Sequence, residues 1–161
     1  MRLDLGTAVA AAGIGVLAGM RGLAAPATVS QRLSHDGLTR QASAALRVFG
    51  SPRTARALKA LAMGELAADK LPFMPDRTAP SSLAFRILSG ALCGAALASW
   101  RRDSAVLGAV VAASAATAAS YGFLAGRRAA GRAGLSNLVS GLAEDALVAG
   151  GYWAAQRALG S

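Results

Sequence analysis

Long apolar runs, separated by short polar segments, dominate the chain. Four of these runs are candidate membrane-embedded helices, namely Leu5–Val29, Leu83–Trp100, Ser104–Gly126 and Leu135–Ala155. The first run exceeds the roughly 20 residues that a helix needs to cross the hydrocarbon core of a bilayer. The third run carries no charge at all. This pattern predicts an all-α fold, an integral membrane helical bundle with at least four embedded segments.

A further helix is expected between the first two runs. The segment Ser30–Arg56 is a basic, polar loop in this interpretation, with a short helix within Thr39–Phe49. Ser51 is suited to cap the next helix, and Pro52 to occupy its first position, where the missing N–H does no harm. Whether the segment Thr54–Leu71 crosses the bilayer stays open, so we predict four or five embedded segments.

Composition supports a single transmembrane domain over residues 1–161. Hydrophobic residues make up 54% of the chain and the mean hydropathy is +0.43. Charged residues make up 16%, below the roughly 25% that is typical of soluble domains. One cysteine, Cys93, and one histidine, His35, are too few for a disulfide, a metal centre or a catalytic triad built on these residues. We therefore predict no metal site, and the sequence indicates no particular cofactor.

The net charge of +9 raises the question of a nucleic-acid partner. The bases lie between apolar runs and not among aromatic residues, so we predict the lipid bilayer as the partner and no nucleic acid. If Thr54–Leu71 does not cross, segments 30–82 and 127–132 hold eleven Lys or Arg residues. The two termini and the 101–103 turn hold four. The positive-inside rule then predicts a multi-pass protein of the bacterial cytoplasmic (inner) membrane, with segments 30–82 and 127–132 facing the cytoplasm.

Glycines recur at helical spacing in three of the apolar runs. The pairs are Gly15 with Gly19, Gly90 with Gly94, and Gly122 with Gly126. Small residues four positions apart let helix backbones approach closely in lipid. We therefore expect tight helix packing, and association into a homo-oligomer or a larger membrane complex.

Acidic side chains share a face with leucines on the helix after Pro52. Leu58, Leu61, Glu65 and Asp69 fall on one side of a helical wheel. The bases of this segment occupy the other side: Arg53, Arg56, Lys59 and Lys70. A solvated helix would place both kinds of charge on its wet side, so this pattern predicts carboxylates that point into the bundle.

The last apolar run repeats this acidic pattern. Asn137, Ser140 and Glu144 form one stripe, and Asp145 is one step round the helix. Ionisable groups inside membrane spans are costly and usually face the bundle interior, which makes them candidates for a substrate or ion site. The candidate residues are Arg21, Glu65, Asp69, Lys70, Arg86, Asn137, Ser140, Glu144 and Asp145.

Three interpretations of these charges stay open. Arg21 and Arg86 could form salt bridges with the acids that only hold the bundle together. Alternatively, the acids outnumber the arginines and line a polar cavity in which they bind a cation or a proton. In the third interpretation the charges lie at the lipid headgroups and do little.

Two motifs resemble a known family. The segment "ELAADKLP", followed by "FRILSG", and the late segment "SNLVSGLAEDAL" resemble small bacterial membrane proteins of domain-of-unknown-function family 4126. The stretch "GMRGLAAPATVS" is similar to the opening helix of that family. The resemblance covers roughly Ala11 to Ala155 and implies a multi-span membrane protein. It draws attention to the acidic motifs and implies no activity.

The predicted function is that of a permease, channel or lipid translocator with an acidic intramembrane site. An inverted repeat, with a polar site at its centre, follows if Thr54–Leu71 crosses the bilayer. One alternative is an accessory or scaffold subunit of a membrane complex. Another is a membrane-embedded enzyme acting on a lipid head group, which the missing phosphate-loop and nucleophile-elbow motifs disfavour.

Overall fold

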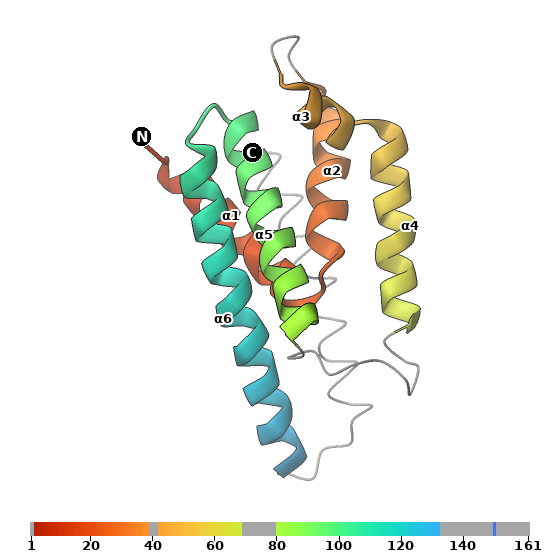
Figure 1. The fold of residues 1–161 in the computed structure, drawn as a ribbon, viewed down its shortest axis with the longest axis vertical. Coiled ribbons are helices and arrows are strands. Elements are labelled where there is room, and N and C mark those ends of the chain that lie inside the picture. The colour runs from red at the N-terminus through yellow and green to blue at the C-terminus, as the bar shows by residue number, and fades with distance from the viewer. Residues whose placement is uncertain (1, 39–41, 69–79, 133–149, 151–161) are drawn as a thin grey trace.

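Helices make up all the regular structure in the part of the chain that is described. The computed structural model describes residues 2–38, 42–68, 80–132 and 150. Within these ranges there are six helices and no strand (Figure 1). They are α1 (Leu5–Met20), α2 (Ala24–Asp36), α3 (Ala44–Phe49), α4 (Pro52–Ala68), α5 (Pro80–Trp100) and α6 (Ala105–Arg132). The predicted helical class is confirmed, and the predicted run Leu135–Ala155 lies outside the described residues.

The helices α1, α5 and α6 pack closely around a core of small residues. Figure 1 shows α5 and α6 antiparallel, with α1 behind them. Buried side chains come from all three helices: Ala11, Ile14, Leu17, Ala18, Cys93, Leu97, Ala112 and Ala116. Alanine in half of these positions keeps the helix axes close together, as in bundles that associate through backbone contact.

Glycines bring α1 and α5 into contact with the α6 backbone. A Cβ atom added at Gly19 would lie 2.7 Å from the Cβ of Ala119, and one added at Gly94 would lie 2.6 Å from the Cβ of Ala112. Both separations are far below van der Waals contact, so these positions accept only glycine without movement of a helix. The predicted role of these glycines in close packing is confirmed.

The third glycine pair has no such role among the described residues. A Cβ atom added at Gly122 or Gly126 would have no described atom within 4 Å. The packed pairs act between helices of one chain, so they give no support for association between copies.

The first apolar run does not form a single helix. Helix α1 ends at Met20, Arg21 has an extended backbone (φ −145°, ψ 120°), and α2 begins at Ala24. Helix α2 then runs back toward the end of the bundle where α1 began (Figure 1). The predicted continuous span Leu5–Val29 is therefore wrong: α1 and α2 form a hairpin. Residues Arg21–Leu23 are called the hairpin tip below.

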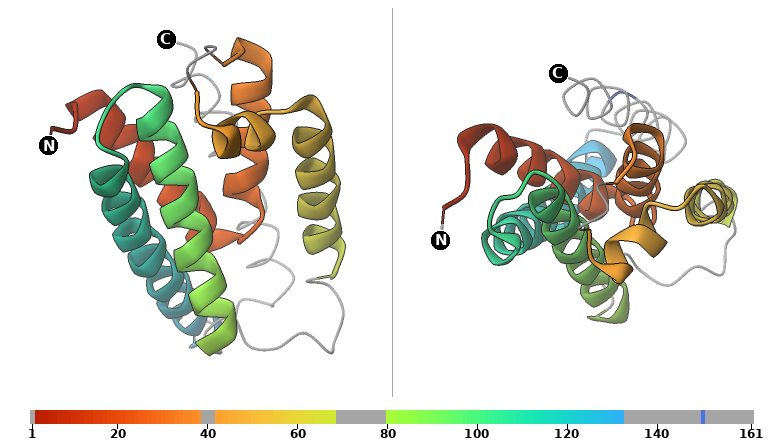
Figure 2. Two further views of the ribbon diagram at one scale, coloured as in Figure 1. Left: turned by 45° about the horizontal axis from the view of Figure 1, so that its top comes forward. Right: turned by 90° about the horizontal axis from the view of Figure 1, so that it is seen from above.

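The return of α2 places α3 at the same end of the bundle as the N-terminus and the α5–α6 turn (Figures 1 and 2). The backbone N–H of Ser104 in that turn donates to the carbonyl of Arg2 at 3.2 Å, which ties the N-terminus to it. The predicted separation of the 30–56 segment from the N-terminus and the 101–103 turn is therefore wrong. Arginines gather at this shared end: Arg2, Arg32, Arg47, Arg53, Arg56, Arg101 and Arg102.

Much of the predicted polar loop is helical. Helix α2 extends to Asp36, and the expected short helix is found as α3, with Ser43 capping it through the N–H of Leu46. The buried hydroxyl of Ser30 donates to the Phe49 carbonyl at 2.5 Å. This bond fixes the C-terminal end of α3 against α2, so the polar segment is folded back onto the bundle.

Helix α4 begins as predicted and lies beside α2. The Ser51 hydroxyl accepts a hydrogen bond from the Thr54 N–H at 3.2 Å, which confirms the expected cap. Ala55 is buried, and Leu58 and Glu65 are partly buried on the same stripe. Leu61 is 56% exposed, so the predicted face is rotated by about one residue. The side chains on the inward face are mostly small and weakly apolar, so the positions of the leucines did not predict this face correctly.

Two of the described helices are long and apolar enough to cross a membrane, α5 over Pro80–Trp100 and α6 over Ala105–Gly126. Helix α1 is apolar but shorter. Large apolar side chains on these three helices stay exposed: Leu5, Val9, Val16, Phe85, Leu88, Leu92, Val106 and Val110. The predicted helical runs Leu83–Trp100 and Ser104–Gly126 are thus confirmed as helices with apolar outer faces.

Candidate polar site at the hairpin tip

The hairpin tip interrupts the helical hydrogen bonding deep within the bundle. The Arg21 N–H donates to the Leu17 carbonyl at 2.8 Å, and the Ala24 N–H donates to the Arg21 carbonyl at 3.2 Å. The other carbonyls at the end of α1 and N–H groups at the start of α2 lack the partners that a continuous helix would give them. The tip is flanked by Ser89, near the middle of α5, and by Ser120, beyond the middle of α6. Its backbone groups therefore need partners from other helices.

Glu65 of α4 supplies acceptors for the start of α2. Its Oε1 accepts from the Gly22 N–H at 3.0 Å, and its Oε2 accepts from the Leu23 N–H at 2.9 Å. Leu23, the residue at the cap position of α2, has no side-chain cap of its own. A carboxylate at a helix N-terminus also interacts favourably with the positive end of the helix dipole. Glu65 therefore caps α2 from a different helix.

Arg86 of α5 supplies donors for the end of α1. Its Nη1 donates to the Gly19 carbonyl at 2.7 Å and to the Met20 carbonyl at 3.3 Å. The side chain is only 6% exposed. A cation beside the last carbonyls of a helix matches the negative end of its dipole. The tip thus lies between an acid at the start of one helix and a base at the end of the other.

Two buried serines complete the hydrogen bonding of the tip. The Ser89 hydroxyl donates to the Gly22 carbonyl at 2.5 Å. The Ser120 hydroxyl donates to the Ala116 carbonyl of its own helix at 2.8 Å and lies 3.3 Å from the Gly19 carbonyl. Neither serine was predicted from the sequence. A signal for Ser89 was present, since it follows Arg86 by three residues and so shares its helix face.

Gly22 lies at the tip against the ring of Phe85. A Cβ atom added there would lie 2.7 Å from the Cδ1 of Phe85, whose side chain is 49% exposed, so a larger residue would require this ring to move. Gly22 was not predicted from the sequence, because one glycine among 19 carries no pattern of its own.

The structure brings together three of the predicted site residues, namely Arg21, Glu65 and Arg86. Arg21 is buried at the tip and is 6% exposed. Glu65 bonds to two backbone N–H groups, and the interpretation in which Arg21 and Arg86 pair with the acids stays open. The other predicted residues lie outside the described residues: Asp69, Lys70, Asn137, Ser140, Glu144 and Asp145.

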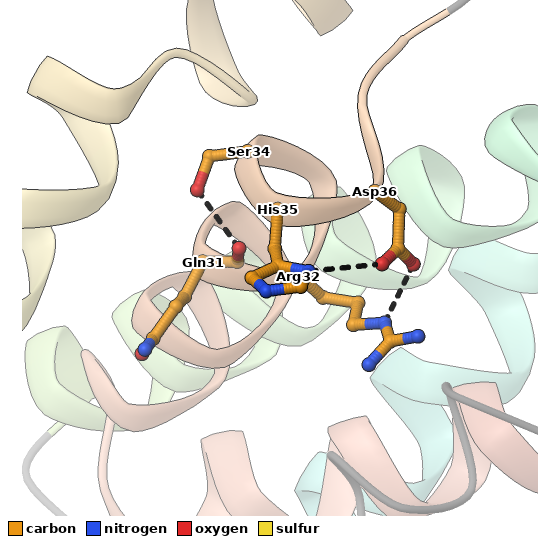
Figure 3. A network of polar contacts seen from close by, with 5 residues as sticks. All are labelled: Gln31, Arg32, Ser34, His35 and Asp36. Carbon is orange, nitrogen blue, oxygen red and sulfur yellow. Dashed lines mark hydrogen bonds and ion pairs between the residues drawn. The ribbon is translucent and has the colours of Figure 1, made fainter.

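The single histidine belongs to a surface network at the end of α2 (Figure 3). The Arg32 Nε lies 2.6 Å from Asp36 Oδ2, and the His35 Nδ1 lies 3.5 Å from Asp36 Oδ1. His35 is 85% exposed and lies in the last turn of α2, not in a loop as predicted. Exposed pairs of this kind typically contribute 0–1 kcal/mol, so the network is a helix-end feature and not a reactive centre.

The described residues offer no group of three or more His, Cys, Asp or Glu side chains that could hold a metal ion. Cys93 is buried in the core. The described polar side chains at the tip are a carboxylate, a buried guanidinium and two hydroxyls, all of which hydrogen-bond to or lie close to its backbone.

These features define an all-helical protein with two helices able to cross a membrane and a charged, internally capped helical hairpin. The chain belongs to the family described as "Domain of unknown function (DUF4126)", whose family model matches residues 8–158. This match confirms the resemblance seen in the acidic motifs. No curated protein and no solved structure matches the chain significantly.

Proposed function

We propose that the protein is a multi-pass membrane protein in which α1 and α2 form a re-entrant hairpin. Helix α1, with 16 residues, is about 24 Å long, shorter than the roughly 30 Å hydrocarbon core. Non-helical backbone at membrane depth is tolerated only where protein satisfies its polar groups. Glu65, Arg86 and Ser89 satisfy the tip in this way, and the exposed apolar faces of α5 and α6 suit contact with lipid.

If the hairpin is re-entrant, the segments before α1 and after α2 should face the same side of the membrane. Cysteines introduced at Arg2 and Ser43, both exposed, should react with an impermeant maleimide from the same side of the membrane. A cysteine at the exposed Arg128, near the end of α6, should react only from the opposite side, and the buried Cys93 should stay unlabelled. Labelling of the Arg2 and Ser43 positions from opposite sides would show that the hairpin crosses the membrane.

For the activity, we propose a permease, channel or lipid translocator with the hairpin tip as its intramembrane site. The observation that carries this proposal is the bidentate bonding of Glu65 to the Gly22 and Leu23 N–H groups. Broken helices whose ends meet charges within the membrane are typical of transport sites. Both carboxylate oxygens of Glu65 act as acceptors, so any change at this side chain alters the two bonds that hold the tip.

A scaffold subunit is the second candidate function. Every buried side-chain nitrogen or oxygen atom among the described residues has a hydrogen-bond partner. A tip whose polar groups all bond within the chain would equally stabilise a rigid surface against which a partner protein packs. This candidate predicts that Glu65 affects stability without affecting any flux.

Flux measurements separate the two candidates. The purified protein in liposomes should carry protons, followed with entrapped pyranine, or exchange fluorescent phospholipids between leaflets, followed by dithionite quenching. Glu65→Gln keeps one acceptor oxygen and should remain folded while it abolishes the measured flux. Ala57→Ser, at an exposed position on the same helix, should leave the flux unchanged. Wild-type rates equal to those of protein-free liposomes in both assays would refute transport of these solutes and favour the scaffold.

A further inference from the structure

Four exposed bases lie on α3 and on the first turns of α4, two helices that contact each other. They are Arg47 on α3 and Arg53, Arg56 and Lys59 on the first turns of α4, and together they are called the basic corner. Viewed from above in Figure 2, α3 and the start of α4 face the reader, at the end of the bundle shared with the N-terminus. No acidic residue occurs in the sequence between Asp36 and Glu65. No acidic residue close in sequence therefore balances the positive charge of the basic corner.

The described acids at this end of the bundle form no ion pair with the basic corner: Asp103 lies in the α5–α6 turn beside Arg101 and Arg102, and the other two have partners elsewhere. Asp36 binds Arg32 and lies close to His35 (Figure 3), and Asp4 accepts from the Gly6 N–H at 2.9 Å as the cap of α1. Within the described part of the chain, no residue of the basic corner forms an ion pair. The four cations are thus available to an anionic partner outside the chain.

The exposed side of α4 changes from basic to apolar along its length. Beyond Lys59, the side chains of Leu61 and Met63 are 56% and 60% exposed. Val48, beside Arg47 on α3, is 66% exposed. Bases next to exposed apolar side chains are the arrangement found at the boundary between lipid headgroups and acyl chains, where Lys and Arg stems lie along apolar surface.

We propose that the basic corner binds the phosphate groups of anionic phospholipids, with Val48, Leu61 and Met63 against their acyl chains. The charge matches the headgroup, and the exposed apolar side chains beside it favour a lipid, which has both a phosphate and acyl chains, over a purely polar partner such as nucleic acid. The proposal rests on the proposed membrane location and is independent of any transport activity. The bases in the basic corner are thus proposed to bind a particular class of lipid, in addition to determining which side of the membrane they face.

The test is a lipid titration on the full chain in dodecylmaltoside micelles. Phosphatidylglycerol should raise the Tm of the wild-type protein, and an equal mole fraction of phosphatidylcholine should not. The variant R53Q/R56Q/K59Q should bind phosphatidylglycerol roughly 100-fold more weakly, since each base near an anionic surface contributes about fivefold. The matched control R128Q/R132Q removes two bases near the other end of the bundle and should bind within about twofold of wild type, because it leaves the basic corner intact.

Three results would overturn the proposal. They are an unchanged affinity in R53Q/R56Q/K59Q, an equal loss in R128Q/R132Q, and an equal Tm shift from inorganic phosphate or phosphatidylcholine. The wild-type protein gives a second readout that does not depend on the folding of any variant. The phosphatidylglycerol shift should fall steeply as salt rises, because exposed charges are screened within about 10 Å at 0.1 M ionic strength, and a salt-independent shift would contradict headgroup recognition.

Discussion

Replacing Glu65 with Ala should lower the free energy of unfolding by roughly 2–4 kcal/mol, since two N–H groups at the tip lose a charged acceptor. Gly22 is buried, so water cannot readily replace the carboxylate there. Ala and Glu have similar helix propensities, so the loss reports on the tip and not on α4 itself. Thermal unfolding of the purified protein in detergent, followed by circular dichroism, measures the effect.

Two further variants define the origin of this loss. Glu65→Gln retains one acceptor and should lose about half as much stability as Glu65→Ala. Met63→Ala truncates a side chain that is 60% exposed and should change the unfolding free energy by less than about 0.5 kcal/mol. Equal losses in Glu65→Ala and Met63→Ala would show that the bonds to Gly22 and Leu23 do not stabilise the hairpin.

Replacing Gly94 with Ala should lower the free energy of unfolding by about 1–3 kcal/mol, because the new methyl group must push α5 away from α6. The methyl carbon would lie 2.6 Å from the Cβ of Ala112, and even closer to the carbonyl oxygen of Gly108. Neither atom is the end of a flexible side chain, so only movement of a helix relieves the overlap. The same thermal unfolding assay measures the loss.

Another glycine of α6 provides a control, since its replacement with Ala is expected to raise the stability. A Cβ atom at Gly122 meets no described atom within 4 Å, so Gly122→Ala should stabilise α6 by up to about 1 kcal/mol through helix propensity alone. Gly90→Ala, with its nearest contact at 3.1 Å, should fall between the two. Destabilisation by Gly122→Ala as large as that by Gly94→Ala would contradict the packing described for α5 and α6.

Helix positions were predictable wherever local chemistry determines them. The charge-free run gave most of α6, and Ser51 with Pro52 gave the start of α4. Two of the three glycine pairs were correctly expected at helix contacts, because only a residue without a Cβ atom permits backbone approach. These features depend on neighbours within one or two helical turns.

The hairpin tip was not predictable from hydropathy. The residues around the tip, from Met20 to Ala27, are apolar except for Arg21, so transfer free energy alone favours one continuous span. The interruption is stabilised by Glu65, Arg86 and Ser89, which are distant in sequence. Tertiary partners therefore override a local pattern that indicated a helix.

Because the hairpin was not predicted, the 30–56 segment was expected at the opposite end of the bundle from the N-terminus and the 101–103 turn, whereas the structure places them at one end. A count of bases assigns sides only when each apolar run crosses, and a hairpin that returns leaves its flanking segments at one end. The candidate acid Glu65 was found because it shares a face with the partly buried Leu58. Its partners were not found, since backbone N–H groups carry no signature in the sequence.

The side chains that hydrogen-bond to the hairpin tip lie far C-terminal to it in the sequence. They are therefore synthesised later than the tip. Glu65 follows Gly22 by 43 residues, Ser89 follows it by 67, and Ser120 follows Gly19 by 101. A nascent α1 and α2 therefore leave the ribosome well before the groups that complete their hydrogen bonds. The hydrogen bonds of the hairpin tip can be completed only after α4 and α5 have been synthesised, so α1 and α2 must wait for later segments before they reach their final arrangement.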